Sequence, residues 1–509
     1  MSELLAGAGL IVVAGASAGA ILLPPGRLRS AAMVLAMVLF PVLILGDQWH
    51  TAQIVDLRQD EGRIVALLAI AAAVVGVLAH LFRRWPILLP LAIIFALPFR
   101  VPLHAGGDTA NLLVPLYLVI GAAVVATLLR DWSDPPSAHP PRALAWVLAA
   151  VVVLYALQTL YSVDFSQGLQ NVCFFLVPFT IAYRLLREVV WDRRLLRWAL
   201  IVIGLEAVLF VCVGSVELAT RSLFWNDQVI RSNEFHTYFR VNSIFWDPNV
   251  YGRYLALVMV IVTAALLWAR TREAFWGLTG LIVVLWIGLV PTYSQSSLIA
   301  LLAGLAVLAA IRWGNPRRTL AVVAIGCIGI AAIIFVAGGK LEIDRINILT
   351  GGRADLVEGG AELFSERPVR GYGSGSFQQA YKDHRKDEDL PVTESHTEPV
   401  TVAAEQGLLG LLLYLSLIGI SLWTLGRGLW TSRAAGGDDR EDSPGRESPR
   451  SETGPAAQAA RAAILAAFVA LLVHTLSYAG FFDDPITWVL LAVGASLAHA
   501  ETAAVRDPA

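Results

Sequence analysis

Arginine and aromatic side chains are interleaved in one polar segment between apolar runs. The segment reads TRSLFWNDQVIRSNEFHTYFRVNSIFWDPNVYGR and contains Arg221, Arg231, Arg240 and Arg253. A guanidinium offers paired donors to phosphate oxygens, and aromatic faces can stack on rings. For Arg221 and Arg231, a belt at the lipid headgroups is the favoured interpretation. Arg240 is a candidate phosphate ligand, because Asp247-Pro248-Asn249 predicts a helix start whose N–H groups would assist it.

A second polar segment, Lys340–Val400, is far longer than most connections, and such loops are usually functional. Gly351-Gly352-Arg353 precedes a weak apolar stripe over Ala354–Phe364. This pattern predicts a short helix that would suit the membrane interface. Gly359-Gly360 argues against that helix.

The middle of this segment is rich in glycine and then in charge. Gly371, Gly373 and Gly375 predict a tight turn. No Lys-Ser/Thr follows that would make the turn a nucleotide site, so it is a weak phosphate-loop signal. The charge run Tyr381–Leu390 is interpreted as a solvated face.

A histidine lies between acids at the end of the segment, in Glu394-Ser395-His396-Thr397-Glu398-Pro399. Neighbouring carboxylates can fix the tautomer of a histidine and raise its basicity. His396 could therefore act as a general base, or as a proton donor when charged. A surface histidine without function fits equally well. The helix predicted from near Thr401 would hold His396 rigidly, which keeps both interpretations open.

Three polar residues interrupt the apolar runs. Glu206 lies within LIVIGLEAVLF, and intramembrane acids are functional candidates by default. A satisfied contact inside a helix bundle explains Glu206 at least as well. Ser294 and Gln295 are predicted to be buried groups that join helices.

The composition defines the class of protein that must position these residues. The chain has 509 residues, of which 57% are hydrophobic and 15% charged, and its mean hydropathy is +0.65. A soluble domain has about 25% charged residues. The net charge of −2 gives no reason to expect a nucleic-acid partner. The three cysteines have neither metal-site nor disulfide spacing, and no metal site is predicted.

The fold class predicted is an all-α integral membrane protein, a polytopic bundle of about 13–15 transmembrane helices with short helices in a large outward loop. The candidate spans are 5–23, 31–47, 63–82, 86–103, 110–130, 143–161, 168–186, 196–216, 250–269, 274–292, 295–311, 319–338, 401–425, 461–480 and 485–500. The segment GGDDREDSPGRESPRSETG is mixed-charge and free of aromatics, so it is predicted to be a disordered linker.

Basic residues gather in alternate connections, at Arg27/Arg29, Arg83/Arg84, Arg130/Arg142, Arg187/Arg193/Arg194/Arg197, Arg270/Arg272, Arg312/Arg317/Arg318 and Arg427/Arg433. The positive-inside rule puts these connections in the cytoplasm, the N-terminus outside and the C-terminus inside. The predicted organisation is N-terminal transmembrane helices 1–217, an outward arginine and aromatic loop 218–249, central transmembrane helices 250–338, a large outward catalytic-type loop 339–400, a transmembrane helix 401–430, a cytoplasmic linker 431–460 and C-terminal transmembrane helices 461–500.

The order of these motifs resembles the O-antigen ligase and Wzy-type polymerase superfamily. In that family a Gly-Arg heads a short helix in the large outward loop, a glycine turn and a histidine follow, and E-x-G-x-x-G opens the next helix. An earlier R-x-x-G-x-F-x-x-P-N precedes another helix. The matching positions of this chain are Arg353, Pro368 through Phe377, His396, Glu405, Gly407, Gly410, and Arg240 through Asn249. The resemblance covers about the C-terminal half. The chain departs from the pattern at Thr397 (usually Asn), at Ser294-Gln295 (often Ser-Arg) and at Ser243 (usually Gly).

The resemblance implies a glycosyltransferase of the cytoplasmic (inner) membrane, acting as an O-antigen ligase or a polysaccharide polymerase. Its partners would be a polyprenyl-diphosphate-linked glycan donor, a glycan or lipid-glycan acceptor and membrane lipid. No cofactor is implied, because the donor already carries a good leaving group. Arg240 and Arg353 match the arginines that hold the diphosphate, and His396 matches the histidine near the acceptor hydroxyl. Substrate contacts are predicted for Asn249, Gly371, Gly373, Gly375, Glu398 and Glu405, and we expect Glu398 to orient His396.

Two other classes of function stay open. A transporter or flippase of lipid-linked glycans would have paired repeats and charged groups near the midplane. Apart from Glu206 the spans offer few such groups. A non-catalytic membrane scaffold would leave the outward arginines and the glycine turn unexplained.

Overall fold

The structure is a computed structural model that describes residues 2–105, 108–133, 142–224, 226–235, 238–314, 353–386, 395–429 and 455–506. The chain divides into two compact units. Unit 1 comprises Met1–Glu188, Asp355–Ser421 and Ala479–Val489. Unit 2 comprises Val189–Ala354, Leu422–Tyr478 and Leu490–Ala509. Each unit thus joins segments that are far apart in the sequence.

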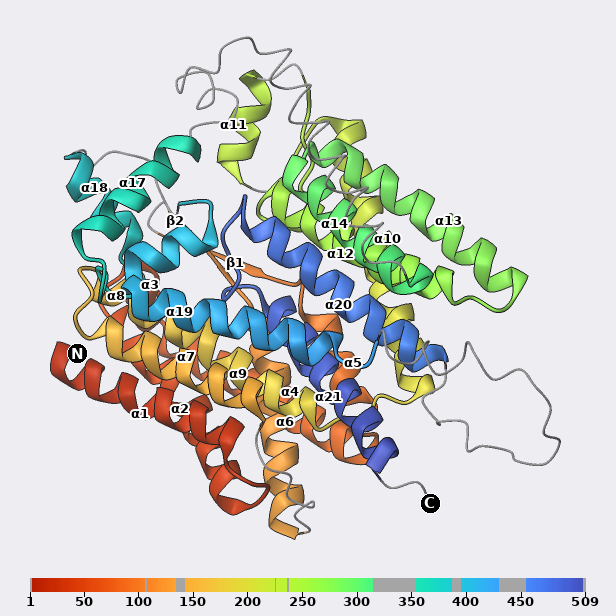
Figure 1. The fold of residues 1–509 in the computed structure, drawn as a ribbon. Helices are drawn as coiled ribbons and strands as arrows, with labels where there is room; N and C mark the ends of the chain where they lie inside the picture. Colours follow the sequence, from red (N-terminus) through yellow and green to blue (C-terminus); the bar gives the residue numbers. More distant parts are fainter. Residues whose placement is uncertain are drawn as a thin grey trace. The chain divides into compact units, whose positions relative to one another are not determined.

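Unit 1 combines the first apolar helices with two short helices of the large loop (Figure 1). Its elements are α1 (Glu3–Leu22), α2 (Arg27–Asp47), α3 (Ala52–Gln59), α4 (Glu61–Arg84), α5 (Leu88–Ala96), β1 (Val101–Ala105), β2 (Asp108–Leu112), α6 (Val114–Ser133), α7 (Ala143–Thr159), α8 (Phe165–Asn171), the π-turn η1 (Val172–Leu176), α9 (Val177–Arg187), α17 (Arg353–Glu366), α18 (Phe377–Arg385) and most of α19 (Glu398–Gly426).

Unit 2 contains the remaining described elements. They are α10 (Arg193–Thr220), α11 (Asp227–Phe235), α12 (Pro248–Leu267), α13 (Arg272–Leu289), the 3-10 turn η2 (Val290–Thr292), α14 (Gln295–Trp313), α20 (Pro455–Thr475) and the larger part of α21 (Pro485–Arg506). Helices α12, α14 and α20 pack closely because small residues line their contact. A Cβ added at Gly304 would lie 2.6 Å from Val260 of α12 and 3.2 Å from the Ala466 carbonyl of α20.

Ten helices of the described chain are long and apolar enough to cross a membrane. Three shorter apolar helices, Val114–Arg130, Ala143–Thr159 and Pro485–His499, accompany them. The prediction of a polytopic, helical membrane protein is confirmed. The span predicted at 319–338 lies outside the described residues.

The span predicted at 86–103 is wrong. Helix α5 ends at Ala96, and a two-stranded antiparallel hairpin follows in which Val101 pairs with Leu112. Pro98 explains the break, because its nitrogen carries no N–H to donate to the carbonyl four residues earlier. The hairpin also means that the described chain is not entirely helical.

The cytoplasmic linker predicted at 431–460 lies mostly outside the described residues. Its final residues are helical, because α20 begins at Pro455 rather than at residue 461. Proline suits the first turn of a helix, and the alanines after it have the highest helix propensity.

The polar residues predicted inside the spans have three different environments. The Tyr254 hydroxyl donates to the buried Glu206 carboxylate at 3.3 Å, so Glu206 has a partner within unit 2. Ser294 is buried and caps α14 by accepting the Ser297 N–H at 3.3 Å. Gln295 is exposed, so its predicted burial is wrong. Ser297 makes the contact between helices instead, donating to the Asn249 carbonyl at 3.4 Å.

Candidate functional site

Arg240 of unit 2 is fixed by neutral groups at both its backbone and its guanidinium. The Asn233 side chain accepts the Arg240 backbone N–H at 3.0 Å and donates to the Arg240 carbonyl at 3.0 Å. Nε donates to the Thr292 carbonyl at 2.9 Å, and Nη2 donates to Asn249 Oδ1 at 3.1 Å. No carboxylate in the described part of the chain forms an ion pair with Arg240. The half-buried guanidinium is therefore held in place by neutral groups, and it forms no ion pair with a carboxylate among the described residues.

The start of α12 positions Asn249 for this contact. Asp247 caps the helix by accepting the Asn249 N–H at 2.6 Å, and Pro248 is its first residue. The helix start predicted from these three residues is confirmed. The sequence did not predict that the buried Asn249 side chain would accept a hydrogen bond from the Arg240 guanidinium.

Glu217 supports the segment that follows Arg240, a role that the sequence did not predict. Its Oε2 accepts the N–H groups of Asn242 at 3.2 Å and Ser243 at 2.7 Å. Ser243 has a φ of 52°, in the left-handed region that glycine adopts most easily. The serine that departs from the family pattern thus keeps a glycine-like backbone, and its hydroxyl donates to the Phe210 carbonyl at 2.8 Å. Glu217 lies in the last turn of an apolar helix, just before the arginine loop, and this position is the sequence feature that could have indicated its role.

The other loop arginines have separate surroundings. The Arg221 guanidinium lies over the Phe239 ring at 5.4 Å, and Arg231 is exposed on α11. Arg253 is buried in α12.

Arg353 is the first residue of α17, so the short helix predicted over Ala354–Phe364 is confirmed. The side chain of Arg353 lies outside the described residues, as do Gly351 and Gly352. Gly359 and Gly360 have low helix propensity and argued against this helix. In the structure, aromatic side chains of α18 pack against α17 at these two glycines. A Cβ on Gly359 would meet the Tyr381 ring, and one on Gly360 would lie 3.2 Å from the Phe377 ring.

The solvated face predicted for Tyr381–Leu390 is confirmed at Asp383, Arg385 and Lys386, which are exposed, but not at Tyr381. Tyr381 is only 4% exposed and joins Leu363, Phe377, Ala380 and Ala404 in one core cluster. The prediction is wrong for Tyr381 because its ring covers the groove that the glycines of α17 leave open. Residues 387–390 lie outside the described chain.

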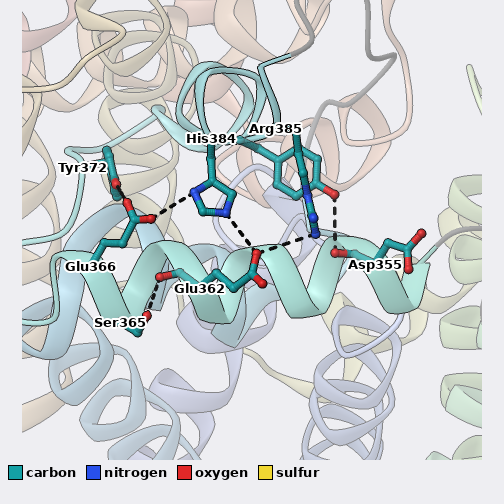
Figure 2. A network of polar contacts seen from close by, with 8 residues as sticks. Asp355, Glu362, Ser365, Glu366, Tyr372, His384 and Arg385 are labelled. Carbon is teal, nitrogen blue, oxygen red and sulfur yellow. Dashed lines mark hydrogen bonds and ion pairs between the residues drawn. The ribbon is translucent and has the colours of Figure 1, made fainter.

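Polar side chains also join α17 to α18 (Figure 2). His384 Nε2 lies 3.0 Å from Glu362, and its Nδ1 lies 3.0 Å from Glu366. The Tyr372 hydroxyl donates to Glu366, which lowers the pKa of that carboxyl. Burial and the neighbouring Glu366 raise the pKa of Tyr372, so the phenol stays protonated as the donor.

The glycine turn pairs with the kink of α19. Gly373 N–H donates to the Glu405 carbonyl at 2.7 Å, and Leu408 N–H donates to the Pro368 carbonyl at 2.7 Å. Gly407 has a non-helical backbone (φ 63°, ψ −163°) that opens the helix for these bonds. The glycine turn and the E-x-G-x-x-G motif, which are separate in the sequence, are therefore joined by backbone hydrogen bonds in the structure.

The same turn packs against the connection between α7 and α8. Ser162 Oγ donates to the Ser374 carbonyl at 3.0 Å, and the Tyr161 hydroxyl donates to the Arg370 carbonyl at 2.7 Å. The sequence offered no signal for this contact, because its partners are about 200 residues apart. Gly371, Gly373 and Gly375 thus all lie in a turn enclosed by other backbone.

His396 directly precedes α19 in an unusual conformation. Its side chain is half-buried, and its φ of 60° is uncommon for a residue other than glycine. Ser395 Oγ accepts the Thr397 N–H at 3.1 Å and lies 2.7 Å from the Thr401 hydroxyl, which closes the turn around His396. Backbone strain of this kind clusters at functional sites.

Glu398 makes a contact that the sequence did not predict. Its Oε2 accepts the N–H groups of Gly480 at 2.8 Å and Phe481 at 3.0 Å. This carboxylate anchors the segment before α21 in unit 1. The predicted orientation of His396 by Glu398 stays a prediction, and Glu394 lies outside the described residues.

Comparison with protein families matches residues 280–415 to the family described as O-antigen ligase. The matched stretch includes Thr292, the glycine turn, His396 and Glu405, whereas Arg240 precedes it. No curated protein matches the chain. The resemblance to the O-antigen ligase family is confirmed for the domain at residues 280–415, whereas the motif from Arg240 through Asn249 lies outside it. With its apolar helices, this domain defines a multi-pass membrane enzyme that processes glycans.

Proposed function

We propose that this protein is a membrane glycosyltransferase, of the O-antigen ligase or polysaccharide polymerase type. It moves a glycan from a polyprenyl-diphosphate lipid to a glycan or lipid-glycan acceptor on the outer face of the cytoplasmic membrane. Arg240 and Arg353 act on the diphosphate, and His396 acts on the acceptor hydroxyl. The reaction uses no metal ion or other cofactor.

The observation that carries the proposal is the setting of Arg240. Its charge is held by the Thr292 carbonyl and the Asn249 amide, and no described carboxylate neutralises it. A fixed, uncompensated guanidinium costs no reorganisation when negative charge develops beside it. That is the property a diphosphate leaving group requires. Arginine suits the task because its planar donors match phosphate oxygens.

The proposed transfer is balanced by groups of this chain and its two substrates. The acceptor oxygen forms a bond to the anomeric carbon as the bond from that carbon to the phosphate oxygen breaks. The hydroxyl proton passes to His396, and the polyprenyl diphosphate leaves with one additional negative charge. The arginines stabilise that charge more strongly in the transition state than in the bound donor.

Transfer from a polyprenyl-diphosphate-linked oligosaccharide by the full chain in proteoliposomes tests the proposal. We expect Arg240→Ala to lower the rate about 100-fold or more, as for other groups that stabilise developing charge. Arg240→Lys should retain part of the activity, because a lysine keeps the charge and loses the fork of donors. Arg231→Ala removes the same charge from an exposed position of the same loop and should leave the rate unchanged.

Two results would contradict the proposal. One is a wild-type rate for Arg240→Ala at equal expression. The other is movement of the lipid-linked glycan across the bilayer with no new glycosidic bond, which would favour the transporter alternative.

A further inference from the structure

An exposed pair of aromatic rings accompanies Arg240 in unit 2. The rings of Tyr238 and Tyr293 are stacked, with centroids 4.5 Å apart and planes inclined by 29°. Tyr238 is 38% exposed and Tyr293 is 50% exposed. The pair therefore presents aromatic surface that the described chain does not cover.

The backbone of Tyr293 is held in a conformation that tyrosine rarely adopts. Its φ of 50° and ψ of 29° lie in the left-handed region, which is disfavoured for a bulky side chain. Its N–H donates to the Val290 carbonyl at 3.1 Å and so closes η2. An aromatic anchor at the lipid headgroups needs no such backbone, whereas strained residues concentrate where ligands bind.

Both tyrosines are attached to the contacts that fix Arg240. Thr292, which precedes Tyr293, accepts the Arg240 Nε–H at 2.9 Å. Val241 N–H donates to the Pro291 carbonyl at 3.1 Å, so the two segments are joined a second time. Tyr238 lies just before Arg240 in the chain. The ring pair and the guanidinium thus belong to one small, cross-linked structure.

We propose that Tyr238 and Tyr293 form a subsite for the sugar that is attached directly to the donor diphosphate. This inference depends on the proposed function, because it takes Arg240 to hold that diphosphate. The C–H face of a sugar is weakly positive and packs on the negative face of an aromatic ring. The phenol hydroxyls can also donate to or accept from sugar hydroxyls. The subsite would distinguish a glycosylated polyprenyl diphosphate from the bare lipid that remains after transfer.

Binding of two probes to the full-length protein in nanodiscs tests the subsite. The probes are undecaprenyl diphosphate and the same lipid carrying one N-acetylhexosamine. We expect the wild-type protein to prefer the glycosylated probe. Tyr238→Leu, and separately Tyr293→Asn, should weaken its binding about tenfold and leave the affinity for the bare lipid unchanged. Asparagine removes the ring at residue 293 and tolerates the left-handed backbone.

Matched variants separate the ring from other effects. Tyr238→Phe keeps the aromatic face and should retain most of the preference. Phe224→Leu removes an exposed aromatic side chain of the same loop and should change neither affinity.

Three outcomes would overturn the inference, and they differ in what they imply. Equal weakening of both probes by Tyr238→Leu would show an anchoring role instead. An unchanged preference in both ring-removing variants would exclude the subsite while the diphosphate site of Arg240 stands. Failure of the wild-type protein to bind either probe would instead overturn the proposed function, and the subsite with it.

Discussion

The carboxylate of Glu405 accepts the backbone N–H of Gly375 at 2.9 Å, which ties α19 to the glycine turn 30 residues earlier in the chain. Its second oxygen accepts the Phe377 N–H at 3.0 Å, at the start of α18. Both oxygens are thus engaged with backbone of the large loop. These contacts give Glu405 a positioning role, which the sequence motif alone does not separate from substrate binding.

Glu405→Gln should destabilise the protein by about 1–3 kcal/mol, because an amide oxygen can replace only one of the two acceptors and buried N–H groups are costly to leave unpaired. The transfer rate should fall with the loss of the loop geometry. Thermal unfolding in detergent measures the first effect and a transfer assay the second. Glu358→Gln makes the same change at an exposed site of α17 and should have no effect. Normal stability of Glu405→Gln would argue against the positioning role.

Gly407→Ala should destabilise the protein by more than about 2 kcal/mol. The Cβ would lie 2.5 Å from the Val369 backbone, at a φ of 63° that alanine rarely adopts. Gly419→Ala in the same helix has nothing within 4 Å of the added Cβ and should be neutral or slightly stabilising. Urea or thermal unfolding of the two variants side by side measures the difference. Equal stabilities would mean that the kink of α19 does not need glycine.

Glu398→Gln distinguishes two roles for this carboxylate. If it orients His396, the variant should shift the pH dependence of the transfer rate, because a neighbouring charge changes the basicity of a histidine. If it acts only through the N–H groups of Gly480 and Phe481, stability should fall while the pH profile keeps its shape. We expect the second result. A shifted profile with unchanged stability would restore the role predicted from the sequence. His396→Ala, measured in parallel, should remove the part of the pH dependence of the transfer rate that comes from the histidine.

The order of the motifs predicted the family. The short helix α17 and the start of α12 could be predicted because each depends on residues that are close together in the sequence. The contacts of Arg240 with Thr292 and of Glu405 with Gly375 could not be predicted, since they join segments through the fold. The glycines of α17 wrongly argued against a helix, because their packing partners belong to another helix, α18. Helix propensity counts Gly359 as unfavourable, whereas the Tyr381 ring requires its missing side chain.

Tyr372→Phe tests the network of Figure 2 by removing one hydroxyl and keeping the ring. The hydrogen bond from Tyr372 lowers the pKa of Glu366, so it favours the folded protein when that carboxylate is ionised. The stabilisation should be present at neutral pH and above the ordinary glutamate pKa of about 4.3, and should disappear as the pH falls through the lowered value. Wild-type protein should therefore unfold at a higher temperature than the variant at pH 7, and this difference should shrink as the pH falls through the lowered pKa of Glu366. A difference that grows on acidification would contradict this assignment.

Glu188 is the shared carboxylate of a cluster of arginines in unit 1, and this cluster is more buried than an ordinary surface ion pair. Its Oε1 lies 2.6 Å from Arg29, whose side chain is fully buried, and 2.7 Å from Arg184. Removing one partner of a buried pair typically costs about 3–5 kcal/mol, because the remaining charge stays in a poorly solvated place. Glu188→Gln should therefore lower the unfolding temperature strongly, and Glu188→Ala more so.

Asp56→Asn is the matched control for Glu188→Gln. Asp56 lies 4.0 Å from Arg63, and both side chains are more than half exposed. Exposed pairs contribute only about 0–1 kcal/mol and are screened by salt. Thermal unfolding at low and high salt should thus give a large, salt-insensitive loss for Glu188→Gln and almost none for Asp56→Asn. A loss for Glu188→Gln that vanishes at high salt would mean that water reaches this cluster, and that burial of Arg29 does not set the stability of unit 1.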